Sequence, residues 1–373
     1  MGNMIVNIGD LLPKVTRVVS ILRSKNVMPI LSSLLVEPFD GSLFITGSDG
    51  DLRLTEKLSI TDCTCTGKKF CVEGNDFLKA IKNLQGPTID VDFDDEKHKM
   101  TIKSGKARIQ LPFRDGSEYP VMKNEKADCP TLDASSSVLY KVISKSIIAV
   151  SDDPLRPMLC GVKLTFDKDM IECAAANRLS LIVCREENLE KSNVGSFVLP
   201  SRVAKLLLSI LSSYDGVVRI EPTESNVVIS TKFTKLFAVV SEGKYPDYNR
   251  VIPQKNDVIS LLDKQELEYA LKCALSMSAD NRRVCLKFSE DNVNISAEDI
   301  EVGKGSTTDM KAEIAVSREI SIGFNGNVLL ELIHNIEEDF VAFELKNERS
   351  SALLRAGDES LRANYVSIIM PMA

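Results

Sequence analysis

The sequence predicts an α+β fold in which one structural plan occurs three times along 373 residues. Three observations lead to this prediction. Each third of the chain reads as helix, strands, helix, strands. The second helix of each third begins near residues 73, 200 and 325. Each run of strands also has a polar turn at the same place. Repetition at one period predicts three domains, each with two helices on antiparallel sheets, at 1–125, 126–252 and 253–373.

The first helix of each repeat is predicted from apolar residues spaced three and four apart. In the first repeat these residues are Leu12, Val15, Val18, Val19 and Leu22. The three helical stretches are IGDLLPKVTRVVSILRSKN (8–26), ASSSVLYKVISKSIIAVSDD (134–153) and DKQELEYALKCALSMSADN (263–281).

The strands that follow are predicted from alternating apolar runs separated by short polar turns. The turns are Asp40-Gly41, Asp167-Lys168-Asp169 and Glu290-Asp291-Asn292. The second helices are EGNDFLKAIKNLQG, PSRVAKLLLSILSS and NGNVLLELIHNIEE, and further strands close each unit. The connectors DGSEYPVMKNEKADCP and GKYPDYNRVIPQKND are polar, carry proline and resemble each other, so the domain boundaries are placed there.

Composition excludes several classes of protein. A net charge of -7 argues against a uniformly basic surface, so any nucleic-acid contact has to come from a local cluster of Lys and Arg. Nine cysteines, mostly inside apolar runs, indicate reduced thiols in the cytoplasm. The Cys63-x-Cys65 pair has no second pair at ligand spacing, and the chain has two histidines, so we expect no metal and no cofactor. No stretch approaches the ~20 apolar residues of a membrane span.

No catalytic constellation is found. His98 and His334 are far apart in sequence, and nothing in the sequence indicates a Ser or Cys nucleophile that pairs with either of them. The Gly-Lys in CTGKKF lacks the glycine spacing of a phosphate loop. We therefore expect a non-catalytic scaffold that offers a shape or a surface.

Six short motifs on this repeat resemble the bacterial sliding clamp family, the beta subunit of DNA polymerase III, over essentially the whole chain. They are PILSSLL, RPMLCGV with NRLSL, YPDYNRVIP, IGFN and IMPM. The resemblance implies a DNA-clamp fold and a head-to-tail homodimer closed into a ring. Such a ring encircles duplex DNA without reading its sequence and tethers the polymerase. The partners it implies are the DNA polymerase III alpha subunit, the clamp loader and other proteins with a clamp-binding motif.

A ring that slides needs phosphate attraction without base contacts, so its helices should carry scattered cations. The first and second helices offer such residues at Lys14, Arg17, Arg23, Lys141, Lys145, Lys264, Lys272, Lys79 and Lys205. Ordinary solubilising charge is the competing explanation for them. The resemblance assigns DNA contact to Lys25, Lys82, Arg156 and Arg202. Asn75 and Asp76 stand where relatives carry basic residues.

The resemblance also implies a groove between the second and third domains that takes a partner peptide. Its matching positions are Leu159, Ala176, Asn177, Arg178, Leu179, Pro246, Arg250, Val251, Asn325, Val328, Ile369, Met370, Pro371 and Met372. Methionine suits a surface that adapts to several partners. Core packing is the alternative for the aliphatic members. The run AAANRL replaces the more usual Thr-Asp-Gly-His-Arg-Leu, and Asn281 replaces a frequent aromatic residue, so the peptide preference is expected to differ.

Ring closure should pair the first domain of one subunit with the third domain of another. The resemblance places Ile109 and Leu111 opposite Leu275 and Met277. A repeat scaffold that binds proteins and never holds DNA is the alternative function.

Overall fold

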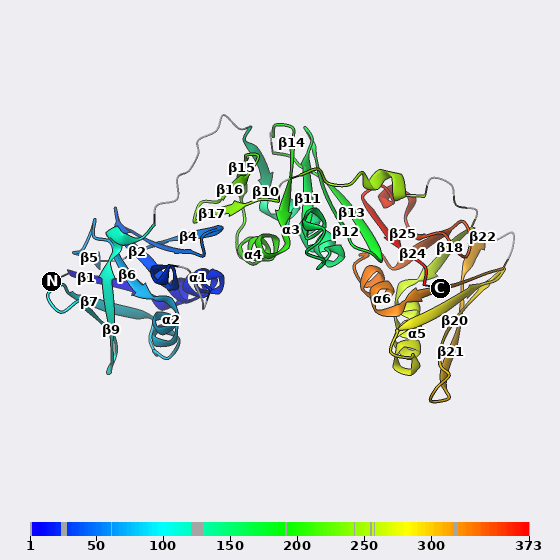
Figure 1. Ribbon diagram of the computed structural model, residues 1–373, viewed down its shortest axis with the longest axis horizontal. Coiled ribbons are helices and arrows are strands. Elements are labelled where there is room, and N and C mark those ends of the chain that lie inside the picture. Colours follow the sequence, from blue (N-terminus) through cyan, green and yellow to red (C-terminus); the bar gives the residue numbers. More distant parts are fainter. Residues whose placement is uncertain are drawn as a thin grey trace. The chain divides into compact units, whose positions relative to one another are not determined.

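The computed structural model describes the residues 2–23, 28–60, 62–120, 130–190, 192–241, 243–253, 256, 258–315 and 319–372, with the backbone alone at 313–315. The chain forms two compact units, and Figure 1 traces both. Unit 1 comprises Met1–Ser136 and Ser209–Val240, and unit 2 comprises Ser137–Leu208 and Ser241–Ala373. Each unit is described by itself.

Unit 1 is built on one antiparallel sheet whose strand order is β10-β15-β16-β17-β4-β3-β2-β6-β9-β8-β7-β1-β5. Helices α1 (Ile8–Ile21) and α2 (Gly74–Lys82) also belong to unit 1. The strands are β1 (Gly2–Asn7), β2 (Ser33–Phe39), β3 (Ser42–Ser48), β4 (Leu52–Ser59), β5 (Asp62–Cys63), β6 (Phe70–Glu73), β7 (Thr88–Asp94), β8 (Lys99–Ser104), β9 (Ala107–Asp115), β10 (Leu132–Ser135), β15 (Val217–Pro222), β16 (Asn226–Ser230) and β17 (Thr234–Val239).

Unit 2 holds two sheets, ordered β14-β11-β12-β13-β26-β25-β24-β18-β22 and β21-β20-β19-β23. Its helices are α5 (Lys264–Met277) and α6 (Gly326–His334), with most of α3 (Ser136–Ser146) and α4 (Ser201–Leu211). The strands are β11 (Gly161–Phe166), β12 (Met170–Ala176), β13 (Ser180–Glu187), β14 (Gly195–Pro200), β18 (Val258–Asp263), β19 (Arg283–Phe288), β20 (Asn292–Asp299), β21 (Lys304–Lys311), β22 (Glu313–Ala315), β23 (Ile320–Asn325), β24 (Phe340–Leu345), β25 (Ala352–Ala356) and β26 (Tyr365–Ile369).

The predicted order of elements, two helices and a strand meander in each repeat, is confirmed. The ends of the first helices were predicted too far along the chain. Helix α1 stops at Ile21 because Leu22 is extended, and α3 tightens after Ser146 into a 3₁₀ turn at Ile147–Ala149. Side-chain caps fix the starts, as where the Asn7 side chain accepts hydrogen bonds from the Gly9 and Asp10 amides.

Glycine opens the second helix of the first and third repeats because no side chain fits there. A Cβ on Gly74 would lie 2.5 Å from Leu22 Cδ1, and one on Gly326 would lie 2.5 Å from Val284 Cγ2. The helix start therefore packs directly on a neighbouring element in both repeats. The domain boundaries at 125 and 252 stay a prediction.

Strands from different repeats join one sheet at two places, here called repeat junctions. At the first junction β4 pairs antiparallel with β17 inside unit 1, and Thr55 faces Lys235. At the second junction β13 pairs antiparallel with β26 inside unit 2, and Val183 faces Val366. The fold thus uses one kind of contact twice to connect successive repeats.

A buried carboxylate stabilises the first junction. Glu56 on β4 is 0% exposed, its Oε1 lies 2.8 Å from Arg17 Nε, and its Oε2 accepts a hydrogen bond of 3.0 Å from Thr234 Oγ1 on β17. Removing one partner of a buried pair leaves an uncompensated charge.

We expect Glu56→Ala to lower the free energy of unfolding of unit 1 by roughly 3 to 5 kcal/mol. Urea unfolding should measure the loss, and hydrogen exchange should locate it at the β4 and β17 amides. Asp51→Ala is the matched control, because this carboxylate is exposed at 3.3 Å from Arg23 and should cost at most about 1 kcal/mol. Equal losses in the two variants would contradict a special role for the buried pair.

Candidate functional site

The apolar C-terminal run forms a buried strand, and the residues that follow this strand are partly exposed. Every residue of β26 is buried, and the strand lies between β13 and β25. Beyond it the Met370 amide donates to the Leu179 carbonyl at 2.8 Å, and the Met372 amide donates to the Gly323 carbonyl at 2.8 Å. Met370 is 45% exposed, so the end of the chain is fixed by backbone bonds while its side chains line a surface.

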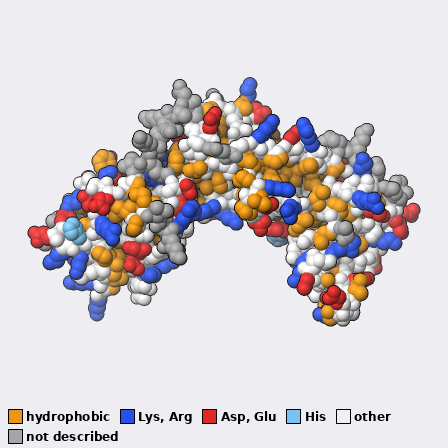
Figure 2. Space-filling view, in the orientation of Figure 1, with side chains coloured by type: hydrophobic (Ala, Val, Ile, Leu, Met, Phe, Trp, Pro, Cys, Tyr) orange, Lys and Arg blue, Asp and Glu red, His pale blue; other side chains and the backbone are white. Residues whose placement is uncertain are grey.

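A buried cluster lies under this surface. Leu181, Val183, Val366 and Ile368 belong to it, and Leu159 and Ala176 pack against it from partly exposed positions. We use the name tail surface for six residues from the 3₁₀ turn before β11, from β12 and the turn that follows it, and from the chain end: Leu159, Ala176, Leu179, Met370, Pro371 and Met372. On the face drawn in Figure 2, hydrophobic side chains gather over the region where Figure 1 draws β13, β24 and β25.

The turn that follows β12 is fixed by Asn177. Its Oδ1 accepts hydrogen bonds of 2.8 Å from the amides of Leu179 and Ser180. The neighbouring Arg178 is exposed, with its guanidinium 3.9 Å from an Asp153 carboxylate oxygen. Asn177 therefore shapes the rim, and Arg178 supplies its positive charge.

Two tyrosines anchor the segment that carries Pro246, Arg250 and Val251. Tyr245 and Tyr248 are buried with ring centroids 6.1 Å apart, and both belong to the cluster under the tail surface. The Tyr248 hydroxyl donates to Glu172, and burial raises the pKa of Tyr248 above its ordinary value. Pro246, Arg250 and Val251 are exposed beside these anchors, with Arg250 Nε 2.9 Å from Asp247.

Asn325 and Val328 lie at the start of α6. The Asn325 Oδ1 accepts hydrogen bonds from the Asn327 and Val328 amides at 3.1 and 3.2 Å, so this residue caps the helix. The bond from Met372 to Gly323 brings the chain end to the same strand terminus. The structure thus assembles the predicted groove positions from five segments of unit 2.

The predicted DNA-contact residues lie apart in sequence and in different elements. Lys82 is exposed in the last turn of α2, and Arg202 is exposed in the first turn of α4. Arg156 is exposed with its Nε 3.9 Å from Asp153. Lys25 lies outside the described residues.

Several of the other helix cations are engaged in ion pairs or backbone bonds. Arg17 binds the buried Glu56, and the side chain of Lys145 is 11% exposed with its Nζ 3.1 Å from Glu337. Lys264 Nζ donates to the His334 carbonyl at 3.3 Å. These three cations are engaged within their own units, so their contact with DNA stays a prediction.

The predicted closure residues lie at two sheet and helix edges. Ile109 and Leu111 are half-buried on β9, and Leu275 is half-buried on α5. Met277 at the end of α5 is 39% exposed.

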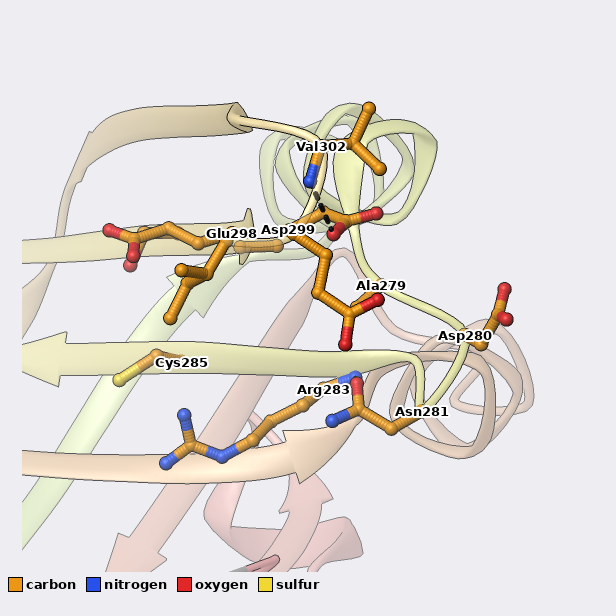
Figure 3. A pocket seen from close by; sticks show the side chains of 12 residues that line it. Ala279, Asp280, Asn281, Arg283, Cys285, Glu298, Asp299 and Val302 are labelled. Carbon is orange, nitrogen blue, oxygen red and sulfur yellow. Dashed lines mark hydrogen bonds between the residues drawn. The ribbon is translucent and has the colours of Figure 1, made fainter.

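A cavity of about 780 Å³ in unit 2 was not predicted from the sequence (Figure 3). Its walls are β19 with the loop before it, and the end of β20 with the turn that follows. Asp280 in the loop and Glu298 and Asp299 at the end of β20 contribute carboxylates, and Arg283 on β19 contributes a guanidinium. Asn281, which the sequence had marked only as an unusual residue, also lines it. No periodic pattern reveals the cavity, because a loop and a turn supply much of its lining.

No group of three or more His, Cys, Asp and Glu side chains among the described residues is placed to hold a metal ion. No described helix is long and apolar enough to cross a membrane.

Comparison with known proteins gives full-length similarity to one family. Profiles of the DNA polymerase III beta subunit match as N-terminal domain at residues 3–123, central domain at 133–247 and C-terminal domain at 249–373. The chain is 24% identical to the beta sliding clamp of Staphylococcus aureus over 302 residues, which are 80% of this chain and 78% of the relative. It is 25% identical to the beta sliding clamp of Bacillus subtilis over 308 residues, or 79% and 78% of the two chains.

Solved structures show the same fold. A sliding clamp from Pseudomonas aeruginosa matches with a TM-score of 0.92 at 22% identity, covering 100% of this chain and 99% of that one. The beta subunit from Thermotoga maritima matches with a TM-score of 0.90 at 20% identity over 100% of both chains. The predicted clamp fold is therefore confirmed, and the chain belongs to the family of the DNA polymerase III beta subunit, the sliding clamps.

Proposed function

We propose that this protein is a non-catalytic sliding clamp. Two copies would close into a ring around duplex DNA and hold the replicative polymerase there through the tail surface. Family membership favours this function over a scaffold that never binds DNA. The observation that carries the proposal is the threefold repeat. Two repeat junctions form within the chain, and the two strands that would form a third junction each have an unpaired edge.

The open strands are β9 in unit 1 and β21 in unit 2. Strand β21 is the last of its sheet. Strand β9 pairs with β8 along one side, whereas on its other side β6 pairs only with Phe113, Arg114 and Asp115 among the described residues. Residues 107–112 therefore present an unpaired edge there, which is a template for another strand.

The register of the third junction follows from the ladders within each repeat. Leu35, Lys163 and Cys285 hold the same place in β2, β11 and β19. From them the strand pairs lead through two steps to Thr55, Val183 and Thr307.

The ladders also give the register of the strand that faces β21 across the third junction. Ile5, Asp133 and Leu261 each stand two residues before the cap of the first helix, and the ladders lead from them to Arg108, Lys235 and Val366. Thr55 faces Lys235 and Val183 faces Val366. Thr307 of one copy should therefore face Arg108 of the second copy.

Side-chain chemistry supports this pairing. In the same register Ile109 and Leu111 hold the places of Leu236 and Ala238, which are 1% and 0% exposed at the first junction. Ile109 and Leu111 themselves are half-buried, as expected of side chains whose cover is the α5 of a second copy. The pairing would also bring opposite charges near each other, because β9 carries Arg108 and Arg114, whereas Glu298 and Asp299 lie on β20, the neighbour of β21.

DNA would be held by phosphate attraction alone. Lys82, Arg156 and Arg202 are exposed, and long cationic side chains neutralise phosphates without reading bases. We include Lys25 on the resemblance alone.

The tail surface would take an extended peptide from the polymerase alpha subunit, from the clamp loader or from another protein with a clamp-binding motif. The side chains of Leu159, Leu179 and Met370 offer apolar contacts, and Arg178 and Arg250 border them with positive charge. Extended peptides are commonly captured beside a strand in this way. The place of action would be the cytoplasm, where the chromosome is replicated.

Lys82→Ala should weaken DNA retention in a salt-dependent manner. Loss of one phosphate contact lowers the slope of log K against log salt by about 1, and affinity should fall equally for all sequences. Retention on nicked circles between low and moderate salt measures the slope. Lys79→Ala in the same helix turn is the control, because Lys79 Nζ lies 3.5 Å from Asp76. A sequence-dependent loss would contradict a phosphate contact.

Linearisation tests enclosure. The protein should load onto nicked circular DNA with its loader, remain bound after unbound protein is removed, and leave when the circle is cut once. Protein that stays on the linear DNA, or that never loads, would favour the scaffold. Adhesion by charge alone would respond to salt and not to cutting.

A further inference from the structure

Unit 1 contains a thiol pair that has no part in the clamp mechanism. Cys63 ends the edge strand β5 and Cys65 follows two residues later, with their Sγ atoms 3.4 Å apart. The chain bends at Thr64 between them, which brings the two sulfur atoms together. No other described cysteines have sulfur atoms in such contact.

Backbone bonds to β1 position the pair. Met4 faces Cys63 across the ladder, the Thr64 amide donates to the Asn3 carbonyl at 2.9 Å, and the Asn3 amide donates to Thr64 Oγ1 at 2.8 Å. A Cβ on Gly2 would lie 2.6 Å from Cys65 Cβ, so the start of β1 covers the second thiol. The pairing of Cys63 with β1 and the backbone bond of Thr64 to Asn3 thus hold the segment that carries the two sulfur atoms.

The two thiols differ in exposure. Cys63 is half-buried, whereas Cys65 is 1% exposed and burial raises its pKa to about 12. A reagent from solution therefore meets Cys63 first. Cys65 is shielded from solution, and the polar contacts of its Sγ are with the sulfur of Cys63 and with the carbonyl oxygen of Asn3, the latter at 3.8 Å.

We propose that Cys63 and Cys65 form a reversible thiol oxidation site that reacts with small disulfides such as glutathione disulfide. The Cys63 thiolate attacks one sulfur of the reagent, forms a mixed disulfide and releases one glutathione thiolate. The Cys65 thiolate then attacks Cys63 Sγ, forms the intramolecular disulfide and releases the second. The two protons of the protein thiols end on the two glutathione thiolates, so two thiols are oxidised and one disulfide is reduced.

The other described cysteines should stop at the first step or not react. Cys173 and Cys184 face each other across β12 and β13, but they are 0% and 1% exposed and lie out of reach of the reagent. Cys285 is half-buried and its Sγ lies 3.2 Å from Ser321 Oγ, so a mixed disulfide there meets a hydroxyl in place of a second thiol.

The experiment uses the full-length protein in glutathione buffers, followed by alkylation, trypsin digestion and mass spectrometry. Both cysteines fall in the single peptide 58–68, which should appear lighter by two hydrogen atoms and without alkyl groups. At a fixed ratio of disulfide to thiol, raising total glutathione should lower the oxidised fraction, because two thiols are released. A peptide that carries glutathione and is insensitive to total concentration would overturn the proposal.

Serine variants isolate the pair. Cys65→Ser should convert the product at Cys63 into a stable glutathione adduct, and Cys285→Ser should leave the Cys63 to Cys65 disulfide unchanged. Loss of the disulfide in Cys285→Ser, or an unmodified peptide 58–68 in the wild-type protein under conditions that modify Cys285, would contradict the assignment. The outcome is independent of clamp function, because loading on DNA is not part of the readout.

Discussion

Ile109→Asp should convert the dimer into monomers. The wild-type protein is expected at roughly twice its subunit mass of 41.2 kDa in solution, and the variant at 41.2 kDa. In the proposed ring this side chain packs against α5 of the second copy, where Leu275 is half-buried. A carboxylate without a partner in that contact costs several kcal/mol, so the dissociation constant should rise at least about 100-fold.

Light scattering measures the mass, and the linearisation assay should show no retained protein for the same variant. Phe39→Asp is the matched control, because it also places a carboxylate on an exposed apolar residue of unit 1, in β2, where 61% of Phe39 is exposed. This control should remain a dimer. An Ile109→Asp protein that keeps the dimer mass would exclude β9 from the closing contact.

Met370→Ala should weaken binding of a polymerase peptide by roughly tenfold to a hundredfold, the range of an interface residue worth about 1 to 3 kcal/mol. The backbone at Met370 is fixed by its bond to Leu179, so truncation removes contact area without releasing the strand. Pro371→Ala should weaken binding in the same direction because it allows the chain end more conformations. Both variants should remain dimers.

Fluorescence anisotropy with a labelled peptide from the alpha subunit measures this affinity. Leu189→Ala supplies the control, since Leu189 is 92% exposed in unit 2 and lies outside the tail surface. Unchanged affinity in Met370→Ala and Pro371→Ala would remove both residues from the site. Equal weakening by Leu189→Ala would point to a general loss of structure.

The fold was predictable from the sequence because it is periodic. Each repeat has to bury apolar side chains of its own. The helical spacing of apolar residues from Leu12 to Leu22 and the repeated polar turns are therefore visible in the sequence. Helix ends were less predictable, because Leu22 and Ile147 continue an apolar pattern while the backbone changes conformation.

The site was predictable only in part. The positions of the tail surface follow from the resemblance. The sequence does not show that the Asn177 side chain accepts hydrogen bonds within a turn, or that Asn325 caps α6. The sequence left the roles of Arg17 and Lys145 open, because a lysine or arginine on a helix looks the same in sequence whether it meets DNA or a carboxylate of its own unit. The cavity of Figure 3 gives no periodic signal, because a loop and a turn supply much of its lining.

Register-specific cross-linking tests closure most directly. Introducing Arg108→Cys together with Thr307→Cys should give a disulfide-linked dimer under mild oxidation, because the two in-chain junctions place their counterparts face to face. Each single substitution alone controls for cross-links to native cysteines. The pair Arg108→Cys with Asp309→Cys controls for a shifted strand register. The account predicts cross-linking for the first pair and little for the others. Equal or stronger cross-linking through Asp309→Cys, or no linked dimer at all, would contradict it.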